Sequence, residues 1–132
     1  MKLYGIKPYK RKARWRKRRD LRRKPAPYLN LIKGSCPIKP NLTWVSDFTY
    51  LRFKGKFFYL ATFMDLFTRE VVGWNISNRH NKELVLNAFM DGFKNRGTLP
   101  KTVHSDQGSE YNCKDYINLM NYLNIQVSMA KK

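Results

Sequence analysis

One continuous stretch, residues 42–76, decides the fold of this chain: LTWVSDFTYLRFKGKFFYLATFMDLFTREVVGWNI. Residues 42–52 and 70–76 are rich in β-branched and aromatic side chains, and residues 57–64 form an uninterrupted apolar run. Short turns separate the three runs, one around Gly55 and one across residues 65–69. The stretch therefore predicts three strands joined as an antiparallel meander, with the middle strand buried on both faces.

The remaining sequence predicts alternating helices and strands. The later elements are predicted at residues 82–95 (helix), 101–105 (strand), 110–123 (helix) and 125–127 (the start of a strand). Asn78 or Asn81 is a candidate N-cap for the first of these helices, and Gly97 is a natural stop. The resulting order, βββαβαβ, predicts an α/β fold.

The positive charge of the chain is concentrated at its beginning. Of the formal net charge of +18, residues 1–40 carry +14, from fifteen basic residues and Asp20. We therefore divide the chain into a basic arm and linker, residues 1–40, and a folded region, residues 41–132. Such an arm attracts a nucleic-acid backbone, although a disordered solubilising tail or an RNA-coating tail has the same composition. The candidate DNA-binding residues are Lys10, Arg11, Lys12, Arg14, Arg16, Lys17, Arg18 and Arg19.

Several other classes of protein find no support in the sequence. Cys36 and Cys113 are far apart, so neither a zinc finger nor a C-x-x-C redox motif is indicated. No signal peptide is visible, and the longest apolar run, Phe57–Met64, is far short of the ~20 residues that span a bilayer. These features predict a soluble intracellular protein without a membrane partner.

Two aspartates are candidates for a metal site. Asp47 lies inside the first predicted strand, and Asp106 directly follows a short one. If the two strands are neighbours, both carboxylates can reach one divalent cation, and hard oxygen ligands suit Mg²⁺ or Mn²⁺. Read singly, Asp106 could instead cap a turn and Asp47 could be a paired polar group.

Several motifs resemble those of the retroviral-integrase-like (DDE) transposases of bacterial insertion sequences. The motifs are Trp44–Tyr50, Met64–Trp74, His104–Tyr111 and Ser128-Met129, which resemble the first strand, the second and third strands, the second catalytic-aspartate motif and the approach to the third carboxylate. Tyr4–Pro8 and the basic run also resemble the linker that follows the helix-turn-helix region of these proteins. The order and spacing of the motifs are more specific than any one of them.

The resemblance implies a ribonuclease H-like core in which Asp47 and Asp106 are catalytic and metal-binding residues. Two Mg²⁺ or Mn²⁺ ions would support phosphoryl transfer on DNA, with transposon ends and target as substrates. The family's glutamate lies farther on than the twenty-six residues after Asp106, so we expect a core incomplete at the C-terminus and impaired in catalysis. A homo-oligomer at the nucleoid of a bacterial cytoplasm is the implied setting.

Two other functions and several nearby residues stay open at this point. The charged arm alone would also suit a non-catalytic nucleic-acid-binding module, and the fold would suit a ribonuclease H-type nuclease acting on hybrids. Glu110 could replace the third carboxylate, but a position at the start of a helix is the favoured interpretation. His104 is expected to pack or hydrogen-bond, His80 to lie exposed in a loop, and Asp65 to belong to a turn.

Overall fold

The computed structural model describes residues 27–34 and 36–130. Its elements follow the predicted order: β1 (Thr43–Phe53), β2 (Lys56–Asp65), β3 (Val71–Ser77), α1 (Lys82–Arg96), β4 (Thr102–Ser105), α2 (Lys114–Tyr122) and β5 (Gln126–Met129). The predicted α/β class and the three-stranded meander are confirmed. None of the helices in the described part of the chain is long and apolar enough to cross a membrane.

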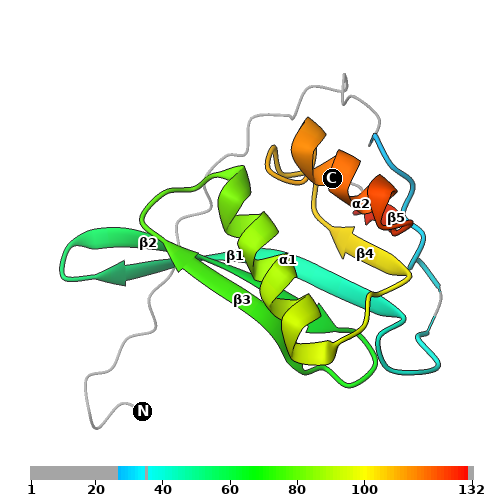
Figure 1. Cartoon of the computed structure of the whole chain (residues 1–132). Coiled ribbons are helices and arrows are strands. Elements are labelled where there is room, and N and C mark those ends of the chain that lie inside the picture. The colour runs from blue at the N-terminus through cyan, green and yellow to red at the C-terminus, as the bar shows by residue number, and fades with distance from the viewer. Residues whose placement is uncertain (1–26, 35, 131–132) are drawn as a thin grey trace, which may run out of the picture.

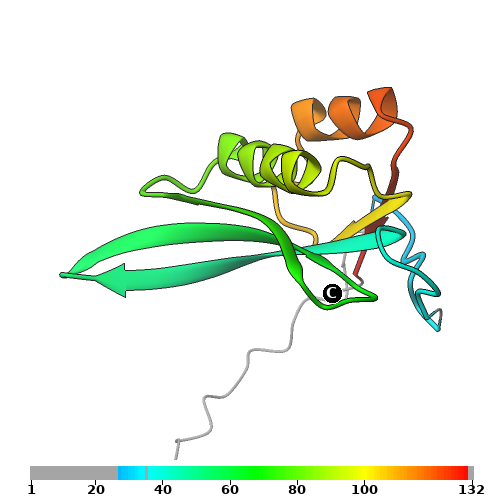
Figure 2. The same cartoon turned by 60° about the horizontal axis from the view of Figure 1, so that its bottom comes forward.

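The five strands form one mixed sheet in the order β3-β2-β1-β4-β5 (Figure 1). The meander supplies the antiparallel pairs β1–β2 and β2–β3, and β4 and β5 then add in parallel beside β1. Both helices lie on the same side of the sheet (Figure 2). The return of the chain through α1 therefore places β4 directly against β1, which brings the two predicted aspartate-bearing segments together.

The core lies between the sheet and α1. Trp44 and Phe63 are fully buried and contact Phe89 of α1, with ring centroids 5.9 and 5.6 Å apart. Gly73 of β3 faces the helix at such short range that a Cβ there would lie 2.2 Å from the backbone nitrogen of Gly92. The close packing of α1 on β3 therefore requires a residue without a side chain at position 73.

Two of the predicted details are wrong. β2 is not buried on both faces, because full and partial burial alternate from Leu60 to Asp65 and no helix in the described part covers the far face. The second helix begins at Lys114 and not at residue 110. The preceding segment forms turns instead, in which the backbone N–H and the side-chain amide of Asn112 both donate to the carbonyl of Gly108.

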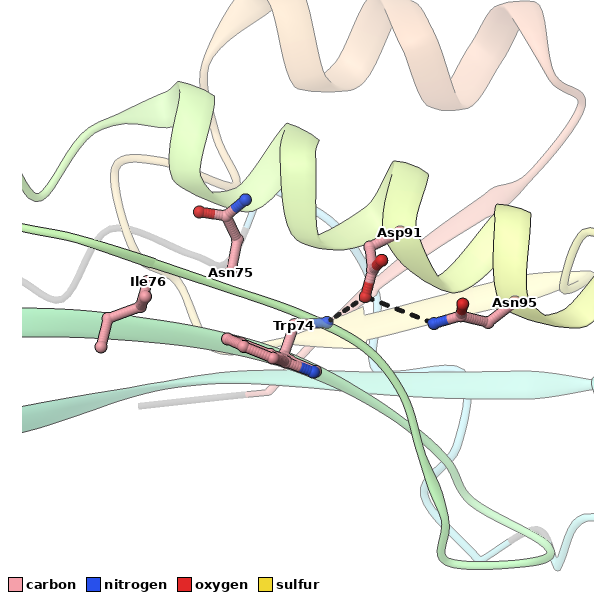
Figure 3. Close-up of a pocket in the computed structure, with 5 residues that line it drawn as sticks. All are labelled: Trp74, Asn75, Ile76, Asp91 and Asn95. Carbon is pink, nitrogen blue, oxygen red and sulfur yellow. Dashed lines mark hydrogen bonds between the residues drawn. The ribbon is translucent and has the colours of Figure 1, made fainter.

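Side chains and an early segment occupy the two margins of the sheet. At β3, Asp91 accepts a hydrogen bond from the backbone N–H of Trp74, and the amide of Asn95 donates to the carbonyl of Val72 and to Asp91 (Figure 3). At β5, the backbone N–H of Met129 donates to the carbonyl of Leu29. The segment before β1 is thus in contact with the last strand of the sheet.

Candidate active site

Asp47 lies in the interior of β1, close to the level at which the shorter parallel strand β4 ends and Asp106 follows it. The pairing of β1 with β4 sets Val45 opposite His104, and continuing that register by two residues brings Asp47 level with Asp106. Trp44 faces α1, so the alternation of β1 directs Asp47 to the face without helices. Both aspartates are exposed, so neither is the buried paired group considered above for Asp47.

Each aspartate is oriented by a neighbouring backbone N–H. Asp47 Oδ1 accepts from the N–H of Phe48 at 2.8 Å, and Asp106 Oδ1 accepts from the N–H of Gly108 at 2.9 Å. No hydrogen bond or ion pair to the remaining oxygen of either carboxylate is found among residues 27–34 and 36–130. One oxygen of each aspartate is therefore held in place while the other remains available to a ligand.

Tyr111 connects this region to the core. It is fully buried, and its hydroxyl lies 2.7 Å from Oγ of Ser46, the residue that precedes Asp47. Burial raises the pKa of Tyr111 most strongly, the hydrogen bond to Ser46 lowers it, and the negative charges of Asp106, Asp47 and Glu110 raise it further. Three carboxylates therefore act on one buried phenol, which stays protonated and fixes β1 against the segment that carries Asp106.

Gly108 lies in a cradle formed by two of these carboxylates. A Cβ at this position would come within 3.0 Å of Asp106 Oδ1 and 3.2 Å of Glu110 Oε2. Glu110 in turn lies 2.8 Å from Nδ1 of His80, and only 10% of its side chain is exposed. The turn after β4 thus gathers two acidic groups around a position where any larger residue would push them apart.

The favoured interpretation of Glu110 as a helix-start residue is wrong. α2 begins four residues later, and Glu110 is held across the molecule by His80. His80 itself is not simply exposed, because its ring packs against those of Phe48 and Tyr59 at centroid distances of 4.5 and 5.1 Å. Nothing local in the sequence signals this pair, because its two members come from loops on either side of α1 and β4.

The expectations for His104 and Asp65 agree with the structure. His104 Nδ1 lies 2.8 Å from Oγ of Ser128 on β5, and burial lowers the pKa of His104. Asp65 ends β2 and accepts hydrogen bonds from the backbone N–H groups of Asn41, Phe67 and Thr68. Asp65 is fully buried, which its place in a turn did not predict.

The donor set at positions 47 and 106 fits a divalent cation. Mg²⁺ is commonly held by one or two carboxylates together with substrate phosphates and water, and both aspartates are accessible. Within the described ranges, no group of three or more His, Cys, Asp or Glu side chains is arranged to hold a metal. The chain offers two carboxylates here and not three, so Glu110 does not complete a three-ligand cluster.

The other predicted binding residues and a surface hollow at the β3 margin lie elsewhere. The candidate DNA-binding residues Lys10 to Arg19 fall outside the described residues. A shallow open hollow is lined by Trp74, Asn75, Ile76, Asp91 and Asn95 at the β3 margin (Figure 3). Neither aspartate lines it, so the candidate site is an exposed strand-end surface and not this hollow.

Comparison with known proteins yields matches over the folded region. Residues 37–132 match the integrase core domain family. The transposase for insertion sequence element IS904 of Lactococcus lactis is 36% identical over 94 residues, which are 70% of this chain and 37% of that protein. The transposase InsF for IS3A of Escherichia coli is 35% identical over 94 residues, 70% of this chain and 33% of its own length. The chain thus spans about a third of the length of these relatives.

Solved structures agree on the fold. The integrase catalytic core domain of HTLV-2, solved in complex with magnesium, superimposes with a TM-score of 0.66 at 19% identity, over 70% of this chain and 62% of the other. A chain of the simian T-cell lymphotropic virus intasome gives 0.68 at 19% identity, over 73% and 34%. The strand order of the sheet agrees with the family match over residues 37–132. This chain belongs to the integrase core domain family and has its ribonuclease H-like fold.

Proposed function

We propose that this chain is the first part of the catalytic core of an insertion-sequence transposase, acting on DNA by metal-dependent phosphoryl transfer. The observation that carries the proposal is that Asp47 in β1 and Asp106 just after β4 lie level on paired strands, each with one oxygen that has no hydrogen-bond partner among the described residues. Family membership supports the same chemistry. Its expected substrates are the ends of a transposable element and a target DNA.

The residues of the chain have separate roles in this proposal. Asp47 and Asp106 would hold Mg²⁺ or Mn²⁺, two ions in the complete site, and the chemistry that such ions supply is charge stabilisation at a DNA phosphate and activation of an attacking oxygen. The N–H groups of Phe48 and Gly108 fix the two carboxylates. The bond between Tyr111 and Ser46 keeps the two strand ends in register. The family's third carboxylate has no assigned counterpart among the described residues, where no group of three or more His, Cys, Asp or Glu side chains could hold a metal.

The setting of the reaction follows from the relatives. A protein that cuts and joins the ends of an element must hold two DNA ends together, so we expect a homo-oligomer. The matched transposases come from bacteria, and the expected cellular location of this chain is the bacterial nucleoid. Residues 10–19, with their dense positive charge, are the proposed anchor on the DNA backbone.

Mn²⁺ binding is the direct test. Paramagnetic Mn²⁺ is expected to broaden the amide signals of Phe48 and Gly108 selectively in NMR spectra of the chain. Asp47→Asn or Asp106→Asn should weaken the binding on the order of tenfold or more, because each removes an anionic ligand. Asp115→Asn is the matched control. It removes an exposed carboxylate of α2 that is paired with Lys82 of α1, and this variant should bind Mn²⁺ as the parent does. Equal Mn²⁺ affinity in all three variants would refute the metal site.

A second candidate function is a non-catalytic nucleic-acid-binding module, favoured by the net charge of +14 over residues 1–40. In that case DNA binding would depend on salt but not on Mg²⁺, and Asp47→Ala would leave it unchanged. Deleting residues 1–26 should abolish most of the binding. If the chain nicks DNA in a metal-dependent reaction and Asp106→Asn abolishes the nicking, the transposase core is supported over the non-catalytic binding module.

A further inference from the structure

The hairpin formed by β1 and β2 extends beyond the rest of the sheet. The pairing of β2 with β3 stops at Tyr59 and Ser77, whereas the pairing of β1 with β2 continues to Phe53 and Lys56. The distal part, residues 51–58, is therefore a two-stranded ribbon without a third strand. Figures 1 and 2 show it projecting past α1, away from both helices.

The end of this ribbon is a tight turn. Lys54 and Gly55 both have positive φ, 46° and 77°, and they join the paired residues Phe53 and Lys56 directly. A two-residue loop with positive φ at both positions matches the right-handed twist of the flanking strands. The ribbon is thus closed by a turn that suits a regular hairpin, and the register of its two strands sets which side chains lie opposite each other.

The ribbon carries only positive charge. Arg52, Lys54 and Lys56 are all exposed, and the sequence has no Asp or Glu between Asp47 and Asp65. None of the three cations takes part in an ion pair among the described residues. Instead, Arg52 lies 6.0 Å from the ring centroid of Phe57, and Lys54 lies 5.4 Å from that of Phe53. The cations are free to meet an external anion.

Exposed aromatic rings alternate with these cations. Tyr50, Phe53 and Phe57 have exposed fractions of 63%, 62% and 57%. Rings beside cations on a protruding element are the combination that meets bases and phosphates in nucleic-acid interfaces. A second copy of this chain is a poorer occupant, because it would bring another +18 and the same three cations to the contact.

We infer that residues 51–58 form a DNA-docking ribbon that enters the major groove beside the phosphate held at the candidate site. This inference rests on the proposed function and names the surface that positions its DNA. The major groove, ~12 Å wide, admits a two-stranded β-ribbon. At ~3.3 Å per residue, the tip at Phe53 lies about 20 Å along the strand from Asp47. The contact therefore falls no more than about six base pairs from the reacting phosphate, at ~3.4 Å per base pair.

Photo-crosslinking tests where the DNA lies. A p-azidophenylalanine replaces Phe53 at the ribbon tip or, as the control, Phe67, an exposed ring in the turn at the opposite end of β2. With Ca²⁺ in place of Mg²⁺ and a labelled duplex, position 53 should give at least fivefold more protein–DNA adduct than position 67. Equal yields from the two positions, or a protein–protein adduct from position 53, would overturn the inference.

Charge removal gives a second, independent readout. Arg52→Gln, Lys54→Gln and Lys56→Gln are combined and compared with Lys33→Gln, Lys39→Gln and Lys94→Gln, three exposed lysines outside the ribbon. The ribbon variant should lose on the order of tenfold in DNA affinity and flatten the salt dependence by about two to three counterions. Equal losses in the two triple variants would refute a specific role for the ribbon.

The two proposals can fail separately. Neither ribbon experiment requires catalysis, so Asp47→Asn combined with Asp106→Asn should retain the position-53 crosslink while losing Mn²⁺ binding. If the ribbon crosslinks DNA but Mn²⁺ binds the double variant as it binds the parent, the metal site is wrong and the docking surface stands. If Mn²⁺ binding depends on the aspartates but the ribbon gives no excess of adduct, only the docking inference falls.

Discussion

The antiparallel half of the sheet, β1 to β3 under α1, and the parallel half, β4 and β5 under α2, differ in how their helices are fixed. α1 has fifteen residues and is capped by Asn81, whose side chain accepts from the N–H of Leu84, and by Gly97. α2 has nine residues, and its N-cap, Cys113, makes no side-chain capping bond. Five residues of α1 are buried but only two of α2.

This difference suggests that the two halves contribute differently to stability and to the candidate site. The antiparallel half contains its own local turns, a capped helix and most of the apolar core, so it can account for much of the stability. The parallel half supplies Asp106 from a four-residue strand and depends on contacts with distant residues, among them Ser46. The proposed metal site thus lies where the half with the longer, capped helix meets the less supported one, and lower local stability is common at functional sites.

The largest effect is expected where α1 meets β3. Gly73→Ala places a Cβ within 2.3 Å of two backbone atoms of α1, and these cannot move without shifting the helix. We expect a loss of about 3 kcal/mol or more in the free energy of unfolding, measured by urea denaturation. Ile76→Ala, at a half-exposed position on the same strand, should cost less than about 1.5 kcal/mol. Similar values for the two variants would contradict the close packing.

An intermediate effect is expected at the bond that joins the halves. Tyr111→Phe and Ser46→Ala each leave a buried hydroxyl without its partner and should cost about 1–3 kcal/mol in unfolding free energy. The double variant should cost little more than either single change, so the coupling should be close in size to one single cost, about 1–3 kcal/mol. Tyr122→Phe, whose ring is 83% exposed, is the control and should be neutral. Strict additivity in the double-mutant cycle would show that the two hydroxyls do not interact.

The smallest effects are expected at the helix starts. Asn81→Ala removes the cap of α1 and should destabilise the protein by about 1 kcal/mol. Cys113→Ser gives α2 a hydroxyl at its uncapped start and should stabilise by about 0.5–1 kcal/mol. Thermal unfolding of the two variants against the parent measures both. A Cys113→Ser variant that unfolds earlier would mean that the start of α2 is already satisfied in another way.

The sequence was sufficient to predict the elements whose signals are local. The apolar run of residues 57–64, the turn at Gly55 and the caps at Asn81 and Gly97 each depend on near neighbours, and the structure places these elements as expected. The start of α2 was misplaced for a related reason. The apolar spacing of residues 110–123 continues into a segment whose hydrogen bonds to Gly108 favour turns over a helix.

Features that depend on distant contacts could not be predicted in this way. The ion pair of Glu110 with His80, and the contact of Leu29 with Met129, join residues with no local pattern in common. The motifs around Asp47 and Asp106 predict two carboxylates, but only the parallel pairing of β1 with β4 sets them level. Their role as metal ligands remains a prediction for the Mn²⁺ experiment.

The treatment of the sheet margins has a consequence for behaviour at high concentration. An open margin offers unpaired N–H and carbonyl groups to a strand from another molecule, which is a common route to β-aggregation. Here Asp91 and Asn95 occupy such groups on β3, and Leu29 occupies one on β5. Intermolecular strand addition is obstructed at those positions, so extension of the sheet is a less favourable route to self-association.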